Sequence, residues 1–408
     1  MTETLKPDNT EQIVDAVQWA LSENCALEIQ GSGSKTGLGR PIECEKIIEL
    51  SSLSGITMYE PDELVMSARA GTPLSDIEST LAENNQMLAF EPPNLNSLLN
   101  GQDAAAGTIG GTIACNLSGP RRLKAGAARD HFLGFTAISG RGEIFKAGGR
   151  VVKNVTGFDL PKLMAGSYGT LSIMSDVIFK VLPVPEKTRT VLIAGATGEQ
   201  AIKAMSMATG SAHEVASATH LSSVFTKSSV VSYVSQAHTS ITALRVEGPG
   251  PSVEHRCKAL REMLSEFGET DELHTTNSLK FWREIRDVHY FGHNQQRQLW
   301  RLSVPPSEGA TTGNGLLNKI GGKGFMDWGG GLVWLEIEPQ DDAAQEIVHA
   351  AARAHGGHAT LVRAAAEVRQ KVDVFHPQSA ALAAITGKVK QGFDPHNILN
   401  PGRMYEGA

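Results

Sequence analysis

The stretch GSGSKTG at residues 31–37 and the longer stretch GTIGGTIACNLSG at residues 107–119 decide the fold of this 408-residue chain. Both contain glycines, which can take positive φ and bring backbone N–H groups close to a ligand. A turn of this kind can present several donors to a pyrophosphate. The two stretches therefore predict two walls of one phosphate cradle, and the ligand expected in it is a dinucleotide.

The residues after the first stretch argue against two common nucleotide-binding motifs. A Rossmann turn leads directly into a helix whose N-terminus holds the pyrophosphate. Here LGRPIE follows at residues 38–43, with glycine and proline where the first helical turns would lie. A Walker A loop fails because Lys35 follows Ser34 rather than glycine. Taken alone, the first stretch could also be a hairpin or Ω-loop with flexible glycines.

The composition predicts a globular chain of two or three domains, with 41% hydrophobic and 20% charged residues. A net charge of -7 argues against a broad nucleic-acid surface, which needs clustered Lys and Arg. The short basic group at residues 121–124 is interpreted as local phosphate chemistry. No apolar run approaches the roughly 20 residues that span a bilayer, and the N-terminus is polar. We therefore expect a cytoplasmic protein without direct membrane insertion.

The cysteines show no paired spacing that would indicate a disulfide framework or an iron–sulfur site. Cys257 falls on an apolar stripe at helical spacing, which predicts a buried small hydrophobe. Cys115 lies inside the second glycine stretch and could approach a cofactor, although packing is the favoured role. The four cysteines are Cys25, Cys44, Cys115 and Cys257.

A succession of motifs resembles the vanillyl-alcohol-oxidase type of FAD-binding fold, also called the PCMH type. Their order and spacing match from about residue 8 to residue 405. Within that superfamily the chain is most similar to the FAD-binding subunits of bacterial glycolate oxidases. The motifs are, in chain order, Gly31 to Gly37, Pro92-Pro93-Asn94, Gly110-Gly111 with Asn116, Thr156-Gly157-Phe158-Asp159-Leu160, Gly169-Thr170-Leu171 and Asp394 to Gly402, followed by Arg403-Met404-Tyr405.

The resemblance implies an α+β chain with three parts. Residues 1–183 form a PCMH-type FAD-binding domain of two α+β subdomains. Residues 184–387 form an α+β cap or substrate domain, for which the strand and helix alternation predicts an antiparallel sheet with helices on one face. Residues 388–408 return to the FAD domain.

The resemblance also implies that FAD lies between the two subdomains, with its pyrophosphate against the two glycine stretches. Covalent flavin attachment in the superfamily commonly uses a histidine in the first cradle, and residues 1–130 contain none. We therefore predict non-covalent FAD. The predicted FAD-binding residues are Gly31, Ser32, Gly33, Ser34, Lys35, Thr36, Pro92, Gly107, Gly110, Gly111, Thr112, Asn116, Gly119, Gly169, Ile173 and Asn400.

Glycolate oxidation to glyoxylate is the activity that the resemblance implies, within a complex that also has a second FAD subunit and an iron–sulfur subunit. Any association with a membrane would then be made through those partners. Two alternatives stay open. The chain could be a stand-alone FAD-dependent oxidoreductase for another hydroxy acid or alcohol, or a structural FAD-binding subunit whose partner carries the catalysis.

Catalysis of 2-hydroxy acid oxidation needs a base for the hydroxyl proton and a cation for the carboxylate. Arg301 is the first choice for the carboxylate anchor, because a guanidinium can bind it bidentately, and Arg363 is a weaker candidate. An ion pair at a domain seam is the competing interpretation for Arg301. His289 and His293 are candidate bases or surface residues. The pair of histidines in HGGH at residues 355–358 is interpreted as a turn, so no metal site is predicted.

Overall fold

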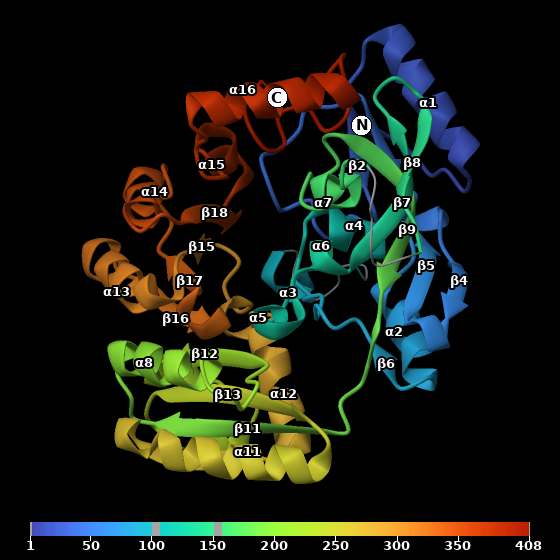
Figure 1. The fold of residues 1–408 in the computed structure, drawn as a ribbon. Helices are drawn as coiled ribbons and strands as arrows, with labels where there is room; N and C mark the ends of the chain where they lie inside the picture. Colours follow the sequence, from blue (N-terminus) through green and yellow to red (C-terminus); the bar gives the residue numbers. More distant parts are fainter. Residues whose placement is uncertain (1, 100–106, 151–156, 408) are drawn as a thin grey trace. The chain divides into compact units, whose positions relative to one another are not determined.

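The structure is a computed structural model that describes residues 2–99, 107–150 and 157–407. Thr156, part of one of the motifs quoted above, lies outside these ranges. The chain divides into two compact units (Figure 1). The first unit comprises residues 1–117, 126–183 and 373–408, and the second comprises residues 118–125 and 184–372.

The first unit alternates short helices and strands, as the sequence predicted for the FAD-binding part. Its elements are β1 (Glu3–Leu5), α1 (Thr10–Glu23), β2 (Leu27–Gln30), β3 (Lys46–Glu49), η1 (Leu50–Ser52), β4 (Ile56–Glu60), η2 (Pro61–Glu63), β5 (Val65–Arg69), α2 (Leu74–Glu83), β6 (Gln86–Met87), α3 (Asn96–Leu99), α4 (Ile109–Ala114), α6 (Ala128–His131), β7 (Phe132–Ser139), β8 (Ile144–Gly148), α7 (Leu160–Met164), β9 (Ser172–Lys180), β10 (Leu182–Pro183) and α16 (Ala380–Phe393).

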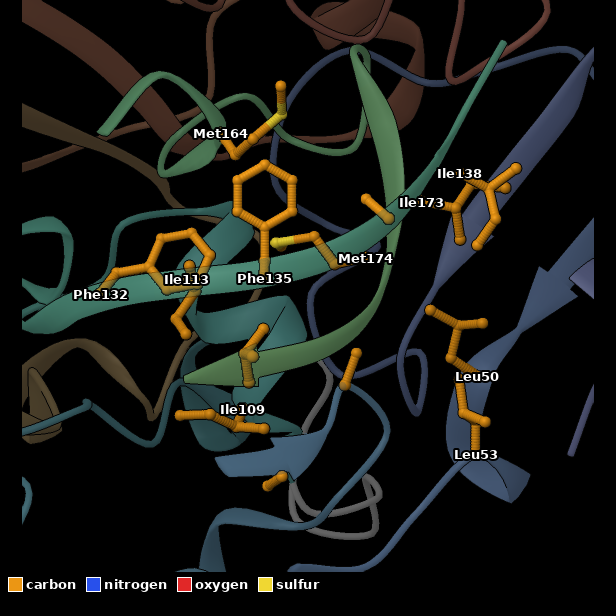
Figure 2. Packing of buried hydrophobic residues seen from close by; sticks show 14 of the residues in the cluster. Leu50, Leu53, Ile109, Ile113, Phe132, Phe135, Ile138, Met164, Ile173 and Met174 are labelled. Atoms are coloured by element: carbon orange, nitrogen blue, oxygen red, sulfur yellow. The ribbon is translucent and has the colours of Figure 1, made fainter. Parts of the chain in front are cut away.

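Three sheets of the described residues organise this unit, and the smallest of them pairs β6 with β10. A three-stranded parallel sheet has the order β1-β3-β2, and a five-stranded antiparallel sheet has the order β4-β5-β9-β7-β8. The core includes Phe135 on β7, Ile173 on β9, and Ile109 and Ile113 on α4 (Figure 2). The glycine-rich helix α4 is thus fixed to the sheet through its isoleucines, which leaves its glycines for another contact.

The second glycine stretch differs from its prediction as a set of turns, because residues 109–114 form the helix α4. Thr108 caps this helix: its Oγ1 accepts a hydrogen bond from the Gly111 N–H at 3.2 Å. The cap offsets the poor helix propensity of two consecutive glycines. The first stretch does form turns, with hydrogen bonds from Thr36 N–H to the Gly33 carbonyl and from Leu38 N–H to the Lys35 carbonyl.

The second unit is built on one antiparallel sheet of eight strands in the order β14-β11-β13-β12-β16-β17-β15-β18. This confirms the α+β class with an antiparallel sheet. Its elements are α5 (Arg122–Ala125), β11 (Lys187–Ala194), α8 (Gly198–Thr209), β12 (Ser217–Leu221), α9 (Ser223–Thr226), α10 (Ser232–Ser235), β13 (Ile241–Gly248), α11 (Gly250–Met263), η3 (Ser265–Phe267), β14 (Glu269–Leu273), α12 (Thr275–Arg286), η4 (His289–Phe291), β15 (Gln298–Ser303), η5 (Pro306–Glu308), α13 (Gly309–Ile320), β16 (Lys323–Asp327), η6 (Trp328–Gly330), β17 (Leu332–Ile337), α14 (Gln345–Ala354), β18 (His358–Arg363) and α15 (Ala366–Lys371).

Helices cover both faces of this sheet, so the expectation of helices on one face is wrong. Val191 on β11 lies in a core cluster with Cys257 of α11, which confirms the buried cysteine. Thr190 points to the opposite face, because side chains alternate along a strand. There its hydroxyl accepts a hydrogen bond at 2.8 Å from the indole N–H of Trp282 on α12.

The C-terminal segment joins the parallel sheet of the first unit. The Leu27 N–H donates to the Ile398 carbonyl at 2.8 Å, and the Asn400 N–H donates to the Leu27 carbonyl at 3.0 Å. Lys390 on α16 stabilises the segment, because its Nζ donates to the Asp394 carboxylate at 2.7 Å and to the Leu399 carbonyl at 2.9 Å. In the structure the chain returns to the first unit at residue 373, whereas the sequence predicted this return at residue 388. In the described ranges no helix has the length and apolarity needed to cross a bilayer.

Candidate functional site: a glycine-lined cleft

A cleft of about 700 Å³ lies within the first unit, and we call it the glycine cleft. It brings residues from both glycine stretches together with residues from β9 and from the C-terminal segment. It is lined by Ile29, Gln30, Gly31, Ser32, Gly33, Ser34, Lys35, Thr36, Leu50, Ala70, Thr108, Gly110, Gly111, Ala114, Cys115, Tyr168, Gly169, Ser172, Met174 and Arg403.

The two glycine stretches touch at Gly31. A Cβ atom on Gly31 would collide with Oγ1 of Thr108, the residue that caps α4. Gly110 is equally constrained, because a Cβ there would lie 2.7 Å from the Ala70 carbonyl oxygen. Gly33 has φ +79°, which glycine adopts without strain. Glycine is therefore required at these points for the backbones to approach one another.

Gly111 has a different environment from its neighbour Gly110. A Cβ at Gly111 would lie 3.2 Å from Thr108 Oγ1 and 3.8 Å from Lys35 Nζ, with no backbone atom among its close neighbours. The position thus faces the interior of the glycine cleft rather than packed chain. A side chain here would occupy ligand space while leaving the backbone contacts intact.

Lys35 supplies one positive charge of the glycine cleft, and Arg403 of the lining supplies another. The Lys35 Nζ lies 3.3 Å from the Ser34 hydroxyl. Part of the side chain remains exposed, yet the surroundings desolvate the ammonium enough to lower its pKa. Among the described residues the one charge that opposes this shift is the Cys115 thiolate, and burial raises the pKa of that thiol. No carboxylate of the described residues contributes to the Lys35 pKa, and a desolvated ammonium in such surroundings would be stabilised by an anionic ligand.

Asn400 connects three parts of the cleft wall. Its Oδ1 accepts a hydrogen bond from the Ile29 N–H at 2.8 Å, and its Nδ2 donates to the Tyr168 carbonyl at 2.7 Å. A Cβ on Gly169 would lie 2.7 Å from that same Nδ2. Asn400 is only 1% exposed, so its amide holds the wall rather than reaching into the cleft.

Several predicted FAD-binding residues lie outside the lining. Ile173 and Thr112 are fully buried, and Ile173 belongs to the core. Asn116 accepts a hydrogen bond from the Arg129 N–H at 3.0 Å. Asn400, described above, also lies outside the lining. So do Pro92, which is buried, Gly107, where a Cβ would lie 2.8 Å from Lys35 Nζ, and Gly119, whose carbonyl accepts a hydrogen bond from the Trp328 indole within the second unit.

Some lining residues were missed by sequence reasoning. Arg403 stands in the closing NPGRMY sequence, and its guanidinium donates to the Arg40 carbonyl and to Glu28 at 3.2 and 3.3 Å. Tyr168 directly precedes the predicted Gly169. Arg403 stood inside a quoted motif and Tyr168 stood next to one, but only the fold shows which residues of such a segment face the cleft. Gln30 and Met174 carried no recognisable signal.

The candidate catalytic residues of the sequence belong to the second unit. Arg363 is buried and donates to Glu336 at 2.8 Å and to the Phe291 carbonyl at 2.6 Å, which makes it a structural ion pair. His289 and His293 contact each other with ring centroids 5.4 Å apart. Arg301 lies elsewhere, with its guanidinium carbon 5.0 Å from the centroid of the Trp328 ring.

The histidine pair at residues 355–358 does not converge on one site. His355 Nδ1 lies 2.9 Å from a Glu308 carboxylate oxygen, whereas His358 begins β18. Within the described ranges no group of three or more His, Cys, Asp or Glu side chains is arranged to hold a metal ion.

Comparisons with known proteins agree with this fold. The family described as FAD binding domain matches residues 3–148, and the family described as FAD linked oxidases, C-terminal domain, matches residues 371–404. A solved structure of p-cresol methylhydroxylase with bound substrate superposes with a TM-score of 0.73 at 14% identity, over 99% of this chain and 88% of that one. The fold and the cleft therefore define a PCMH-type flavoprotein that binds FAD.

Sequence relatives show which family within this class of flavoproteins the chain belongs to. The glycolate oxidase subunit GlcE of Escherichia coli (strain K12) is 34% identical over 402 residues, which cover 98% of both chains. The glycolate oxidase subunit GlcD of Bacillus subtilis (strain 168) is 29% identical over 189 residues, which are 46% of this chain and 38% of that relative. The chain belongs to the family of FAD-linked glycolate oxidase subunits represented by GlcE.

The residues of the glycine cleft fit the pyrophosphate of FAD. Lys35 offers a desolvated positive charge, Ser32, Ser34 and Thr36 offer hydroxyl groups, and Gly111 lines the cleft without a side chain that would occupy the space of phosphate oxygens. These donors can bind a dinucleotide without a helix of Rossmann type.

Proposed function

We propose that this chain oxidises glycolate to glyoxylate as the FAD-binding subunit of a multi-subunit complex. The observation that carries the proposal is the 34% identity with a glycolate oxidase subunit over nearly the whole of both chains. The glycine cleft supports it, because its donors suit the cofactor that such a reaction needs.

The residues of the first unit would bind and position the cofactor. Lys35 and the hydroxyls of Ser32, Ser34 and Thr36 would neutralise and solvate the pyrophosphate. When bound, FAD supplies a hydride acceptor, which oxidation of a 2-hydroxy acid requires. The absence of histidine from residues 1–130 supports non-covalent binding.

Partners would complete the electron path. We propose a second FAD-containing subunit and an iron–sulfur subunit, with electrons leaving this flavin toward them. The similarity between this chain and GlcD supports a partner built on a related FAD domain. Any membrane association would be made by those partners. Co-purification of a cysteine-rich chain with this one would support the complex.

An anaerobic absorbance spectrum of the purified chain before and after adding glycolate tests the proposal. Acid precipitation of the same sample then shows whether the yellow chromophore is released. We expect released FAD that bleaches with glycolate. Released FAD that stays oxidised would assign substrate oxidation to a partner or to another substrate, and a folded chain without flavin would contradict the proposal altogether.

A further inference from the structure

Another cavity is formed by residues of the second unit alone, where β16 begins and β17 ends. It has a volume of about 640 Å³, and we call it the Glu336 cavity. Lys323 of β16 lies opposite Glu336 of β17 in the strand pairing, so both side chains belong to the same end of the sheet. Tyr290, Phe291, Asn294 and Arg297 complete the part of the lining that carries the argument below.

Glu336 has one carboxylate oxygen that lacks a hydrogen-bond donor. Its side chain is 1% exposed, and Oε1 accepts a hydrogen bond from Arg363 at 2.8 Å. Oε2 lies 3.2 Å from Lys323 Nζ and 3.7 Å from an Arg297 nitrogen. Neither contact is a hydrogen bond, and no other described residue donates one to Oε2. A buried carboxylate oxygen in this state costs free energy, which a donor inside the cavity would recover.

Lys323 has unused donor capacity beside that oxygen. Its ammonium forms the ion pair with Glu336 and lies 5.5 Å from the Phe291 ring centroid and 5.9 Å from that of Phe225. An ammonium carries three donors, and within the described part of the chain none of them makes a hydrogen bond to a protein acceptor. A hydroxyl group both donates and accepts, so one hydroxyl can serve Glu336 Oε2 and Lys323 Nζ together.

The charges around the Glu336 cavity balance one another. Ion pairs and hydrogen bonds connect its lining to three cations and three carboxylates of the described residues. An anion inside it would lie beside the buried Glu336 carboxylate, which is unfavourable, whereas a neutral hydroxyl needs no counter-charge. The cations are Arg297, Lys323 and Arg363, and the carboxylates are Glu284, Glu336 and Glu338.

The rest of the lining offers an apolar wall and an exposed amide. Tyr290 and Phe291 are buried, and the Tyr290 hydroxyl is already engaged with Glu284 at 2.8 Å. Asn294 is exposed; its Oδ1 accepts from the Gln296 N–H at 3.0 Å, which leaves its NH₂ group as a donor. A carbon skeleton that carries several hydroxyls suits such a combination of apolar and polar groups.

We infer that the Glu336 cavity binds a small neutral polyol, with one hydroxyl that donates to Glu336 Oε2 and accepts from Lys323 Nζ. The inference is independent of the proposed function, because every residue that carries it belongs to the second unit. Open-chain polyols and monosaccharides share the required chemistry of adjacent hydroxyl groups. The test therefore includes one compound of each kind.

The test is a saturation-transfer NMR titration of the full FAD-loaded chain with erythritol, an open-chain polyol, and with D-ribose, a ring sugar. The compound 1,2-dimethoxyethane is the analogue that accepts hydrogen bonds but cannot donate them, and glycolate and inorganic phosphate are the anions. The variants are Lys323→Met and, on the exposed amide, Asn294→Ala. Lys319→Met on α13 is the matched control, because Lys319 is exposed and lies outside the lining. Tryptophan fluorescence and thermal unfolding show whether each variant is folded.

We expect at least one of the two polyols to bind and 1,2-dimethoxyethane not to bind. Lys323→Met should weaken the bound polyol by about tenfold or more, the scale of one hydrogen bond to a charged group, and Asn294→Ala by a smaller factor. Lys319→Met should bind like the unmodified chain. A folded chain that binds neither polyol would show that the cavity holds water only. That result, an anion bound more tightly than either polyol, or a folded Lys323→Met with unchanged affinity would each overturn the inference.

Discussion

The glycine cleft of the first unit and the arginine cluster of the second unit, in which Arg122 and Arg301 contact Trp328, both carry positive charge, but they are built differently. In the cleft the chain brings backbone close to the ligand by removing side chains, and one desolvated lysine supplies charge. In the cluster long side chains converge on an aromatic platform, and charge is concentrated on two guanidiniums. The glycine cleft depends on the lack of side chains at its glycine positions. The arginine cluster depends on the contacts that its long side chains make.

Filling the cleft should have the largest effect. Gly111→Leu places a side chain where no backbone atom opposes it, so the chain should fold while FAD binding is lost almost completely. Flavin absorbance per chain measures the loss, and circular dichroism checks the fold. Gly315→Leu on α13 is the matched control, because a Cβ there meets nothing within 4 Å. Stoichiometric flavin in Gly111→Leu would refute the placement of the pyrophosphate.

Acid should destabilise the second unit, which contains the arginine cluster. Burial lowers the pKa of His220 on β12 to about 4, and His220 pairs with Met326, two residues before Trp328. The unfolded chain takes up this proton near pH 6.5, so stability falls as the pH drops below 6.5. The loss reaches about 3 kcal/mol once the pH is below 4.

Urea unfolding at several pH values, followed by tryptophan fluorescence, measures this loss. Four of the five tryptophans, Trp282, Trp300, Trp328 and Trp334, lie in the second unit, so the signal reports mainly on it. His220→Gln can keep a hydrogen bond to the Thr242 hydroxyl, which now lies 2.9 Å from the His220 ring. The variant should show a smaller dependence between pH 4 and 6.5, and an unchanged dependence would exclude His220 as its source.

Lys35→Met should separate affinity from stability. FAD should bind about tenfold to a hundredfold more weakly, because a charge-assisted contact to phosphate is lost. The FAD-free chain should become slightly more stable, since the variant removes a desolvated ammonium whose pKa is lowered. Flavin titration and thermal unfolding measure the two effects, and Lys146→Met is a control on a lysine of β8. A loss of both affinity and stability would make Lys35 a packing residue instead.

The contrast also explains what the sequence could predict. Glycine stretches carry a local signal, because a short segment determines both the conformation and the chemistry, and the FAD class followed from their order. The role of Asn400 required knowing that β2 pairs with residues near the other end of the chain. The cluster required Arg122 to belong to the second unit although it follows the glycine stretch of the first. The spacing of residues along the sequence indicates neither the position of Asn400 beside β2 nor that of Arg122 in the second unit.

The hydrogen bond between Asn400 and Ile29 spans 371 residues of sequence and closes the wall of the glycine cleft. During synthesis the segment that contains Ile29 leaves the ribosome long before Asn400 is made. The wall of the glycine cleft therefore stays incomplete while the second unit is being synthesised. The complete wall of the glycine cleft is therefore available only once residue 400 has been synthesised.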